Sequence, residues 1–186
     1  MSVPCEPPSA KLIVGFFLKD KGLAGRVCAL LTDAFGPLDL VSPWLFFGFT
    51  DYYAAEMGSP LFRRLLAFQT PVPQDRLSEI KLRTNDIEQE TAEEGKRRIN
   101  LDPGLLTAER FVLATGKNYT HRIYLGRGIF ADLTLIYHKG GFEPLPWTYP
   151  DYGQPEPRLF LERARKKYLA DRKSGGDRAL QREKTR

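Results

Sequence analysis

The sequence is poor in cysteine and has no long apolar run. Its two cysteines, Cys5 and Cys28, are too few and too far apart for a disulfide framework or a metal knuckle, so both are expected to be reduced thiols. No stretch approaches the roughly 20 apolar residues of a membrane span, and no charged segment precedes an apolar one as in a signal peptide. The sequence therefore predicts a cytoplasmic protein without a membrane partner.

Motifs for phosphate loops and metal sites are also missing. The nearest approach to a P-loop, ATGKN at 114–118, lacks the first glycine and the hydroxyl after the lysine. His121 and His138 could meet across a hairpin, but no H-x-x-x-H or C-x-x-C spacing accompanies them. No metal ligands are therefore predicted, and the cofactor is left unknown.

An excess of positive charge is missing from most of the chain. Residues 153–186 hold 11 Lys and Arg against 5 Asp and Glu, or +6, which leaves 17 against 18, or −1, for residues 1–152. A nucleic-acid surface spread over the body is therefore not expected. The sequence predicts a flexible leader (1–10), one domain (11–152) and a basic tail (153–186). In that tail, a linker at 155–157 precedes a helix over 158–173 and a disordered end from Ser174.

Apolar periodicity predicts the elements of the domain. Residues 11–19 place apolar side chains on both faces of an extended strand, as in the centre of a sheet. Apolar residues then recur at the spacing of a helix over 23–35 and again over 74–94. The remaining expectations are strands at 38–49, 61–70 and 97–102, a short helix or turn at 107–115, a hairpin of 121–125 with 129–139, and an extended proline- and aromatic-rich strap at 142–152.

This element order predicts an α+β fold. The order β-α-β-β-α-β followed by a hairpin matches a split β-α-β, or ferredoxin-like, sandwich with helices on one sheet face. The C-terminal hairpin and the strap would extend that sandwich. A three-layer α/β arrangement is the alternative, because element order does not choose between the two.

Polar side chains gather around residues 97–125 and predict a ligand site. In an extended strand Arg98, Asn100 and Asp102 share one face, and Pro103 with Gly104 predicts a turn directly afterwards. Arginine and lysine side chains suit a phosphate or carboxylate. The expected ligand-binding residues of this polar cleft are Asp51, Tyr53, Lys81, Asn85, Arg98, Asn100, Lys117, Arg122, Tyr124 and Trp147.

Two features of this predicted cleft have more than one interpretation. Lys81, Asn85 and Glu88, spaced by four and three, either form a solvated ion-pair row or face the ligand. Asp102 or Glu56 would act as a general base and His121 as a general acid or base, if the protein is an enzyme. The sequence does not decide between an enzyme and a binding protein. The expected ligand is small and anionic, and the aromatic residues suit a ring such as that of a nucleotide.

Two other functions also fit the sequence. The basic residues of 158–186 would attract nucleic acid or a ribonucleoprotein. The strap would be a partner-binding scaffold if Trp147 and Tyr149 are exposed, and not if they are buried. The oligomeric state is not predicted.

Seven short motifs resemble one bacterial family. They are FTDYY at 49–53, EMG at 56–58, KLRTN at 81–85, NLDPG at 100–104, VLAT at 112–115, HRI at 121–123 and PLPWTYPDY at 144–152. Together, over residues 11–152, they resemble the family called domain of unknown function 4416. The resemblance implies a bacterial cytosolic protein and brings no established activity, ligand or fold with it.

Overall fold

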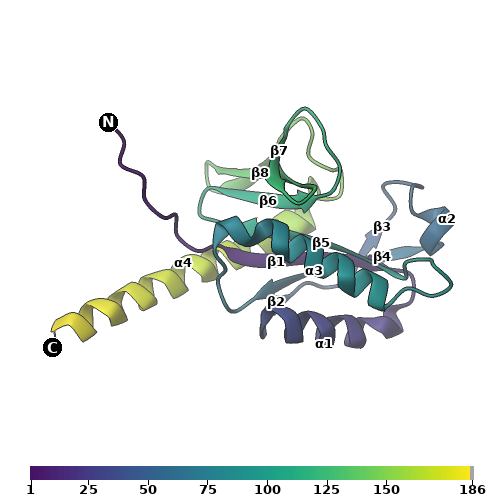
Figure 1. The fold of residues 1–186 in the computed structure, drawn as a ribbon, viewed down its shortest axis with the longest axis horizontal. Helices are drawn as coiled ribbons and strands as arrows, with labels where there is room; N and C mark the ends of the chain where they lie inside the picture. The colour runs from purple at the N-terminus through teal and green to yellow at the C-terminus, as the bar shows by residue number, and fades with distance from the viewer. Residues whose placement is uncertain (185–186) are drawn as a thin grey trace.

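The protein is an α+β chain, as expected (Figure 1). The structure, a computed structural model, describes the backbone of residues 1–184 and the side chains of residues 1–174. Short 3₁₀ turns at Lys21–Leu23 and Gln74–Arg76 precede two of the helices. The elements are β1 (Lys11–Leu18), α1 (Ala24–Phe35), β2 (Leu38–Val41), β3 (Leu45–Phe47), α2 (Ala54–Met57), β4 (Leu61–Phe68), α3 (Leu77–Glu90), β5 (Ile99–Leu106), β6 (Arg110–Thr115), β7 (Arg122–Gly126), β8 (Ile129–His138), β9 (Gly141–Pro144) and α4 (Pro155–Lys184).

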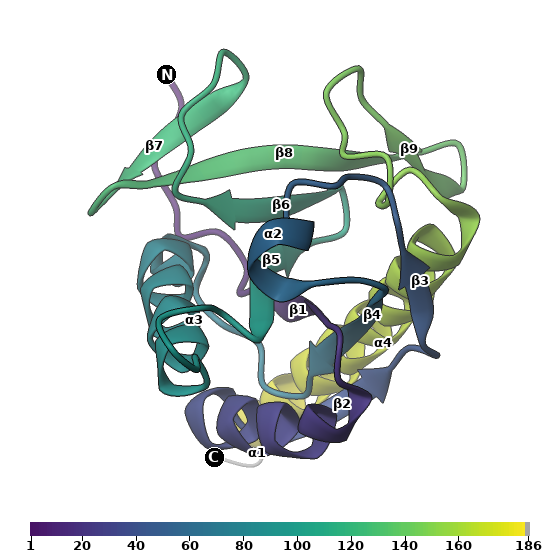
Figure 2. The same cartoon turned by 90° about the vertical axis from the view of Figure 1, so that its right-hand side faces the viewer.

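The strands form one antiparallel sheet in the order β2-β4-β1-β5-β6-β8-β7, with β3 on β4 and β9 on β8. The part β2-β4-β1-β5 has the order of a split β-α-β unit. Because β3 and β6 to β9 extend the sheet, the ferredoxin-like topology itself stays a prediction. In Figure 2, β6 and β8 run across the view while β1 and β4 are foreshortened, so the sheet bends sharply beyond β5.

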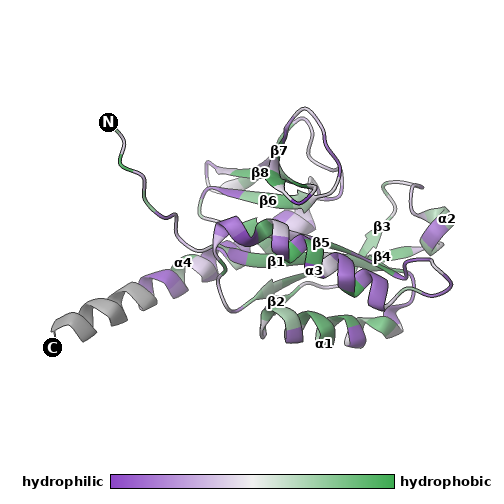
Figure 3. Cartoon of the chain, viewed as in Figure 1, coloured by the Kyte–Doolittle hydropathy of each residue, from purple (hydrophilic) through white to green (hydrophobic). Residues whose placement is uncertain are grey.

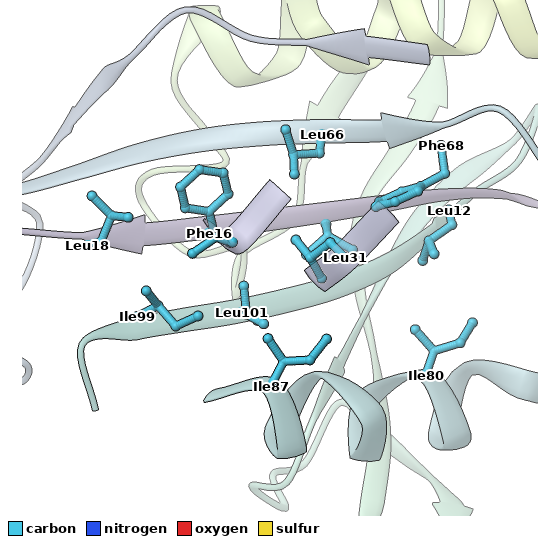
Figure 4. Close-up of a cluster of buried hydrophobic side chains, with 12 residues drawn as sticks. Leu12, Phe16, Leu18, Leu31, Leu66, Phe68, Ile80, Ile87, Ile99 and Leu101 are labelled. Carbon is cyan, nitrogen blue, oxygen red and sulfur yellow. The ribbon is translucent and has the colours of Figure 1, made fainter. Parts of the chain in front are cut away.

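Helices cover both faces of the sheet, and β1 lies between them with all eight residues buried. Leu12, Val14, Phe16 and Leu18 pack against α1 and α3 on one face (Figure 4). On the other face, a second cluster that includes Ile13 packs against α4, whose buried side chains recur at helical spacing: Phe160, Leu161, Ala164 and Tyr168. The fold therefore has a helical layer on the face that the expected sandwich leaves open. Figure 3 shows the green strands between these layers and purple patches along α3.

The expected linker at 155–157 is wrong, because α4 begins at Pro155. The first turn of a helix tolerates proline, since the backbone N–H groups there have no partner within the helix. The disordered end expected from Ser174 falls, from residue 175, outside the described side chains. The α4 backbone continues to Lys184, and residues 185 and 186 lie outside the description. No helix in the described part is long and apolar enough to cross a membrane.

Two local expectations between residues 102 and 115 are also wrong. Residues 110–115 form strand β6 rather than a helix or turn, and their burial largely alternates with period two. The turn expected after Asp102 is absent from the described chain, because β5 continues through Pro103 to Leu106. The N–H and C=O groups of Leu101 bond to α3, away from β1. Pro103, two residues further, directs its missing N–H toward the same side, so it costs no bond with β1.

Candidate functional site: a cleft where two strands separate

A cleft of about 650 Å³ opens where β5 and β6 separate. These strands pair from Gly104 to Leu106 with 111–113, while Ile99–Pro103 has no strand on its outer edge among residues 1–184. Asn100 and Asp102 project from the free half of β5, and Thr115 and Lys117 lie at the end of β6. The gap between the two strands therefore places polar groups far apart in sequence around one space.

Side chains of α3 occupy the free edge of β5. Lys81 Nζ donates to Leu101 O at 2.7 Å, and Leu101 N donates to Glu88 Oε1 at 2.6 Å. Both α3 side chains are buried, and burial raises the pKa of the Glu88 carboxyl above its ordinary value. These two residues are therefore not part of a solvated row. They satisfy the backbone groups that a neighbouring strand would otherwise bind.

Arg63 of β4 lies on the floor of the cleft, with 3% of its side chain exposed. Its Nη1 is paired with Asp151, and its Nη2 lies 3.9 Å from Asp102 Oδ2. The guanidinium carbon lies 4.2 Å from the centroid of the Tyr152 ring. Asp151 and Tyr152 belong to the strap, so Arg63 connects the central sheet to the strap beneath the cleft.

Several buried polar atoms on the cleft floor have no hydrogen-bond partner among the described residues. They are Nε and Nη2 of Arg63, Nδ2 of Asn100 and the hydroxyl oxygen of Tyr152. Burial raises the pKa of the Tyr152 hydroxyl above its ordinary range, so this group is a neutral donor. An unpaired buried polar group costs about 1–3 kcal/mol. The floor is therefore rich in donors that can bind acceptor atoms of a ligand.

The carboxylates of the cleft differ in how firmly they are paired. Asp151 is bound to Arg63, Asp132 to Arg122, and Glu88 to Arg97. Asp102 is 30% exposed, and the described residues donate no hydrogen bond to its side chain. Asp102 is therefore the carboxylate of the cleft that is freest to accept a hydrogen bond.

Arg97 connects α2, α3 and β5 at one end of the cleft. Its Nε and Nη2 donate to the two carboxylate oxygens of Glu56 at 2.8 and 2.7 Å. Its Nη1 donates to Glu88 Oε2 at 3.2 Å and to Asn100 Oδ1 at 3.1 Å. Hydrogen bonding to Arg97 lowers the pKa of the Glu56 carboxyl. Glu56 is therefore an ionised partner of Arg97.

A second network holds the strap against β8 behind the cleft. Asp132 is 1% exposed, and its Oδ2 accepts from Arg122 Nε at 2.9 Å and lies 3.1 Å from His121 Nε2. Arg122 Nη2 also donates to the Tyr149 hydroxyl at 2.7 Å. The His121 ring stacks on Trp147 with centroids 4.9 Å apart. Asp132 lines the cleft, whereas His121 and Arg122, which contact the Asp132 carboxylate, lie outside the cleft lining.

Aromatic rings form a wall of the cleft next to α2. Phe17 stacks on Phe47 with centroids 4.4 Å apart, and Tyr53 packs edge-on against Phe17 at 4.7 Å. Burial, followed by the charge of Asp102, raises the pKa of the Tyr53 hydroxyl above its ordinary range. Lys117, two residues after the end of β6, meets this wall with its Nζ 4.2 Å from the Tyr52 ring centroid. The cleft thus combines an apolar wall of aromatic rings with a floor that is rich in hydrogen-bond donors.

The structure brings together about half of the residues expected at the site. Tyr53, Lys81, Asn85, Asn100, Asp102 and Lys117 line the cleft. The others lie outside its lining: Glu56, His121 and Arg122 support it, Trp147 stacks behind it, and Asp51 is exposed beside α2. Arg98 binds Glu93 and Asp20, and the exposed Tyr124 lies on β7.

Sequence reasoning missed the residues that organise the floor. Arg63 carried a weak signal, because a charged residue on each face of a strand is unusual in a buried sheet. The alternation of an extended strand predicts Arg98, not Arg97, at the site, but β5 begins only at Ile99, so this alternation does not apply to residue 98. No local sequence pattern indicates that Asp132 and Asp151 are buried in ion pairs, since this depends on side chains from other segments of the chain.

The geometry defines an α+β protein with a polar, aromatic-lined cleft at a break in its sheet. The chain matches the model of a family described as a domain of unknown function (DUF4416) over residues 8–168, and it belongs to this family. The match reaches past the strap into α4, which packs on the sheet. Comparisons with curated proteins and with solved structures found no match.

Proposed function

We propose that the cleft binds a small ligand through a carboxylate or phosphate group placed on its floor. The observation that carries the proposal is the group of buried donors on Arg63, Asn100 and Tyr152, which have no acceptor among the described residues. Buried donors in folded proteins are nearly always satisfied, and oxyanions are the acceptors that a guanidinium binds most strongly. An anion here would satisfy several donors at once.

The aromatic wall favours a ligand that also carries a ring, such as a nucleotide. Rings stack favourably on aromatic side chains, and Lys117 at the rim would add a charge for a second anionic group. The volume of about 650 Å³ lies within the usual range for small-molecule sites. The ligand class we propose is therefore a ring-bearing phosphate or carboxylate.

Asp102 is the group that we propose for proton transfer, if a reaction occurs in the cleft. Its carboxylate is partly exposed and lies 3.9 Å from Arg63 Nη2, next to the proposed anion position. A general base must lie within hydrogen-bond reach of the proton that it removes. The firm pairing of Glu56 with Arg97, and of His121 with Asp132, favours Asp102 over these two residues.

The basic helix α4 provides weaker support for a nucleic-acid function. Arg165 donates to Ala108 O at 2.7 Å and stacks 3.4 Å from the Tyr137 ring centroid. Lys167 binds Asp39 and Asp171. These basic side chains are engaged within the chain, which favours the cleft as the functional site.

The test is a thermal-shift screen of nucleotides, sugar phosphates and dicarboxylates, followed by calorimetry on the hits. Asn100→Asp keeps the acceptor for Arg97 and replaces the unpaired donor by a negative charge, so we expect at least a tenfold loss of affinity. Arg98→Gln, which changes the net charge equally but lies outside the cleft, is the matched control and should bind like the wild type. Compounds that bind Asn100→Asp with the same affinity as the wild type, or a screen in which no compound binds, would contradict the proposal.

A further inference from the structure

A second hollow, of about 690 Å³, adjoins the cleft on the side of α4. It lies between the segment from β2 to β3 and the first turns of α4. Its lining is largely apolar and includes Val41, Pro43, Phe46, Phe49, Leu159 and Phe160. We call this hollow the apolar groove.

The apolar groove exposes more hydrophobic surface than isolated surface residues would. Val41, Phe46, Phe49 and Leu159 are 46%, 68%, 43% and 49% exposed, and they come from three separate segments that meet at this groove. Contiguous apolar surface of this kind marks an interaction site in soluble proteins. Its charged neighbours Glu156 and Arg163 are exposed and opposite in sign, so the groove carries little net charge.

The apolar groove and the cleft are adjacent and have four lining residues in common. Phe47, Phe49, Arg63 and Asp151 line both hollows. Asp151 is bound to Nη1 of Arg63, which leaves Nε and Nη2 of this buried guanidinium without a hydrogen-bond partner in the described chain. A single ligand can therefore place an anionic group on Arg63 and continue over Phe47 and Phe49 into the apolar groove.

We propose that the apolar groove holds the hydrocarbon chain of an amphiphilic ligand, such as a medium-chain carboxylate or alkyl phosphate, whose head group binds Arg63. This inference rests on the anion-binding part of the proposed function and adds a hydrocarbon chain to the ligand, and it does not require the ring that the aromatic wall favours. The continuity of the two hollows supports it, together with the buried, unpaired donors at their junction. The head group of the ligand binds the donors of the cleft floor, and its hydrocarbon chain covers Phe46, Phe49 and Leu159 and so removes them from water.

Chain-length dependence tests the inference directly. Straight-chain carboxylates from two to twelve carbons are titrated below their micelle concentrations by calorimetry. Each methylene that enters the groove should tighten binding about threefold to fourfold, until the groove is filled.

Variants separate the groove from the head-group site. Phe46→Ser and Leu159→Ser change exposed side chains, so the fold is retained, and they should flatten the dependence on chain length while leaving acetate and phosphate binding unchanged. Ile123→Ser, at a position on β7 that is 70% exposed, is the matched control. Asn100→Asp should weaken the whole series through the head group.

The outcomes are distinct for the two proposals. Anions that bind with equal affinity at every chain length would overturn the apolar groove and leave the proposed function in place. Chain-length dependence that persists in Phe46→Ser and Leu159→Ser, or is lost equally in Ile123→Ser, would also overturn the groove assignment. Failure of long-chain carboxylates to bind would overturn the apolar groove, and failure of the nucleotides, sugar phosphates and dicarboxylates of the screen as well would overturn both proposals.

Discussion

A Cβ atom at Gly15 would lie 2.8 Å from Nη2 of Arg63. It would also lie 2.9 Å from the Tyr152 hydroxyl oxygen and 3.2 Å from Cδ2 of Leu65. Gly15 occupies the middle of the central strand β1, opposite Leu65 and Asp102. The missing side chain at this position is what leaves room for a guanidinium and a phenol on the cleft floor.

Gly15→Ala should therefore disturb the floor of the cleft. Arg63 and Tyr152 would have to move, and overpacking of a buried site costs about 1–3 kcal/mol. Urea denaturation measures the loss. The control is Gly25→Ala in α1, where a Cβ atom meets nothing within 4 Å and should raise stability by about 0.5–1 kcal/mol. Equal effects of the two substitutions would contradict the close approach.

Glu56→Gln should lower stability at neutral pH more than at acid pH. Arg97 holds the folded-state pKa of Glu56 below the unfolded value of about 4.3, so the contribution is present above that pH and lost as pH falls through the folded value. The side chain is a third exposed, and solvent screening limits the effect to about 0.5–1 kcal/mol.

Denaturation curves between pH 2 and 7 measure this difference. Glu79→Gln, whose partner Arg76 is largely exposed, should change stability by less than about 0.5 kcal/mol at any pH. A wild-type advantage over Glu56→Gln that stays constant down to pH 2 would show that the Arg97 pair is not its source.

Lys81→Met should loosen the free edge of β5. The substitution keeps the length of the side chain but removes the donor to Leu101 O, and an unsatisfied buried carbonyl costs about 1–3 kcal/mol. Hydrogen exchange should accelerate at Leu101, whose N–H binds Glu88. Lys96→Met, at an exposed position, is the comparison and should leave stability within about 0.5 kcal/mol of the wild type.

Asp132→Asn should release the strap from β8. Arg122 would lose its buried counter-charge, a change that costs about 3–5 kcal/mol. Since Trp147 stacks on His121, its fluorescence should shift as the strap loosens. Asp171→Asn removes one of the two partners of the more exposed Lys167 and should have little effect. Unchanged Trp147 emission in Asp132→Asn would count against the link between Asp132 and the strap.

The elements could be predicted where a local pattern decides them. Residues 11–19 are apolar in both alternations, and β1 is buried on both faces. The glycines at 126 and 128 predict the turn between β7 and β8, where both adopt positive φ. Asn100 and Asp102 share a face because the period of a strand places them there. In each case, neighbouring residues carry all the information.

The remaining features depend on contacts between distant segments. The pair Arg63 and Arg64 predicts one charge on each face of β4, but α4 and the strap decide which face becomes the cleft floor. Pro155 and Pro157 are typical of a linker and equally of the first turn of a helix, and burial of Phe160 and Leu161 decides between them. Local pattern could not predict such outcomes, because they are set by tertiary packing.

The side chains that satisfy Leu101 have a consequence for self-association. An open strand edge inside a gap is a template on which another chain can add a strand and start aggregation. Lys81 and Glu88 bind the N–H and C=O groups of Leu101 that such a strand would need. Both side chains come from a helix, which presents no unpaired strand edge. The protein can therefore keep its two strands apart without exposing the free edge of β5 to neighbouring molecules.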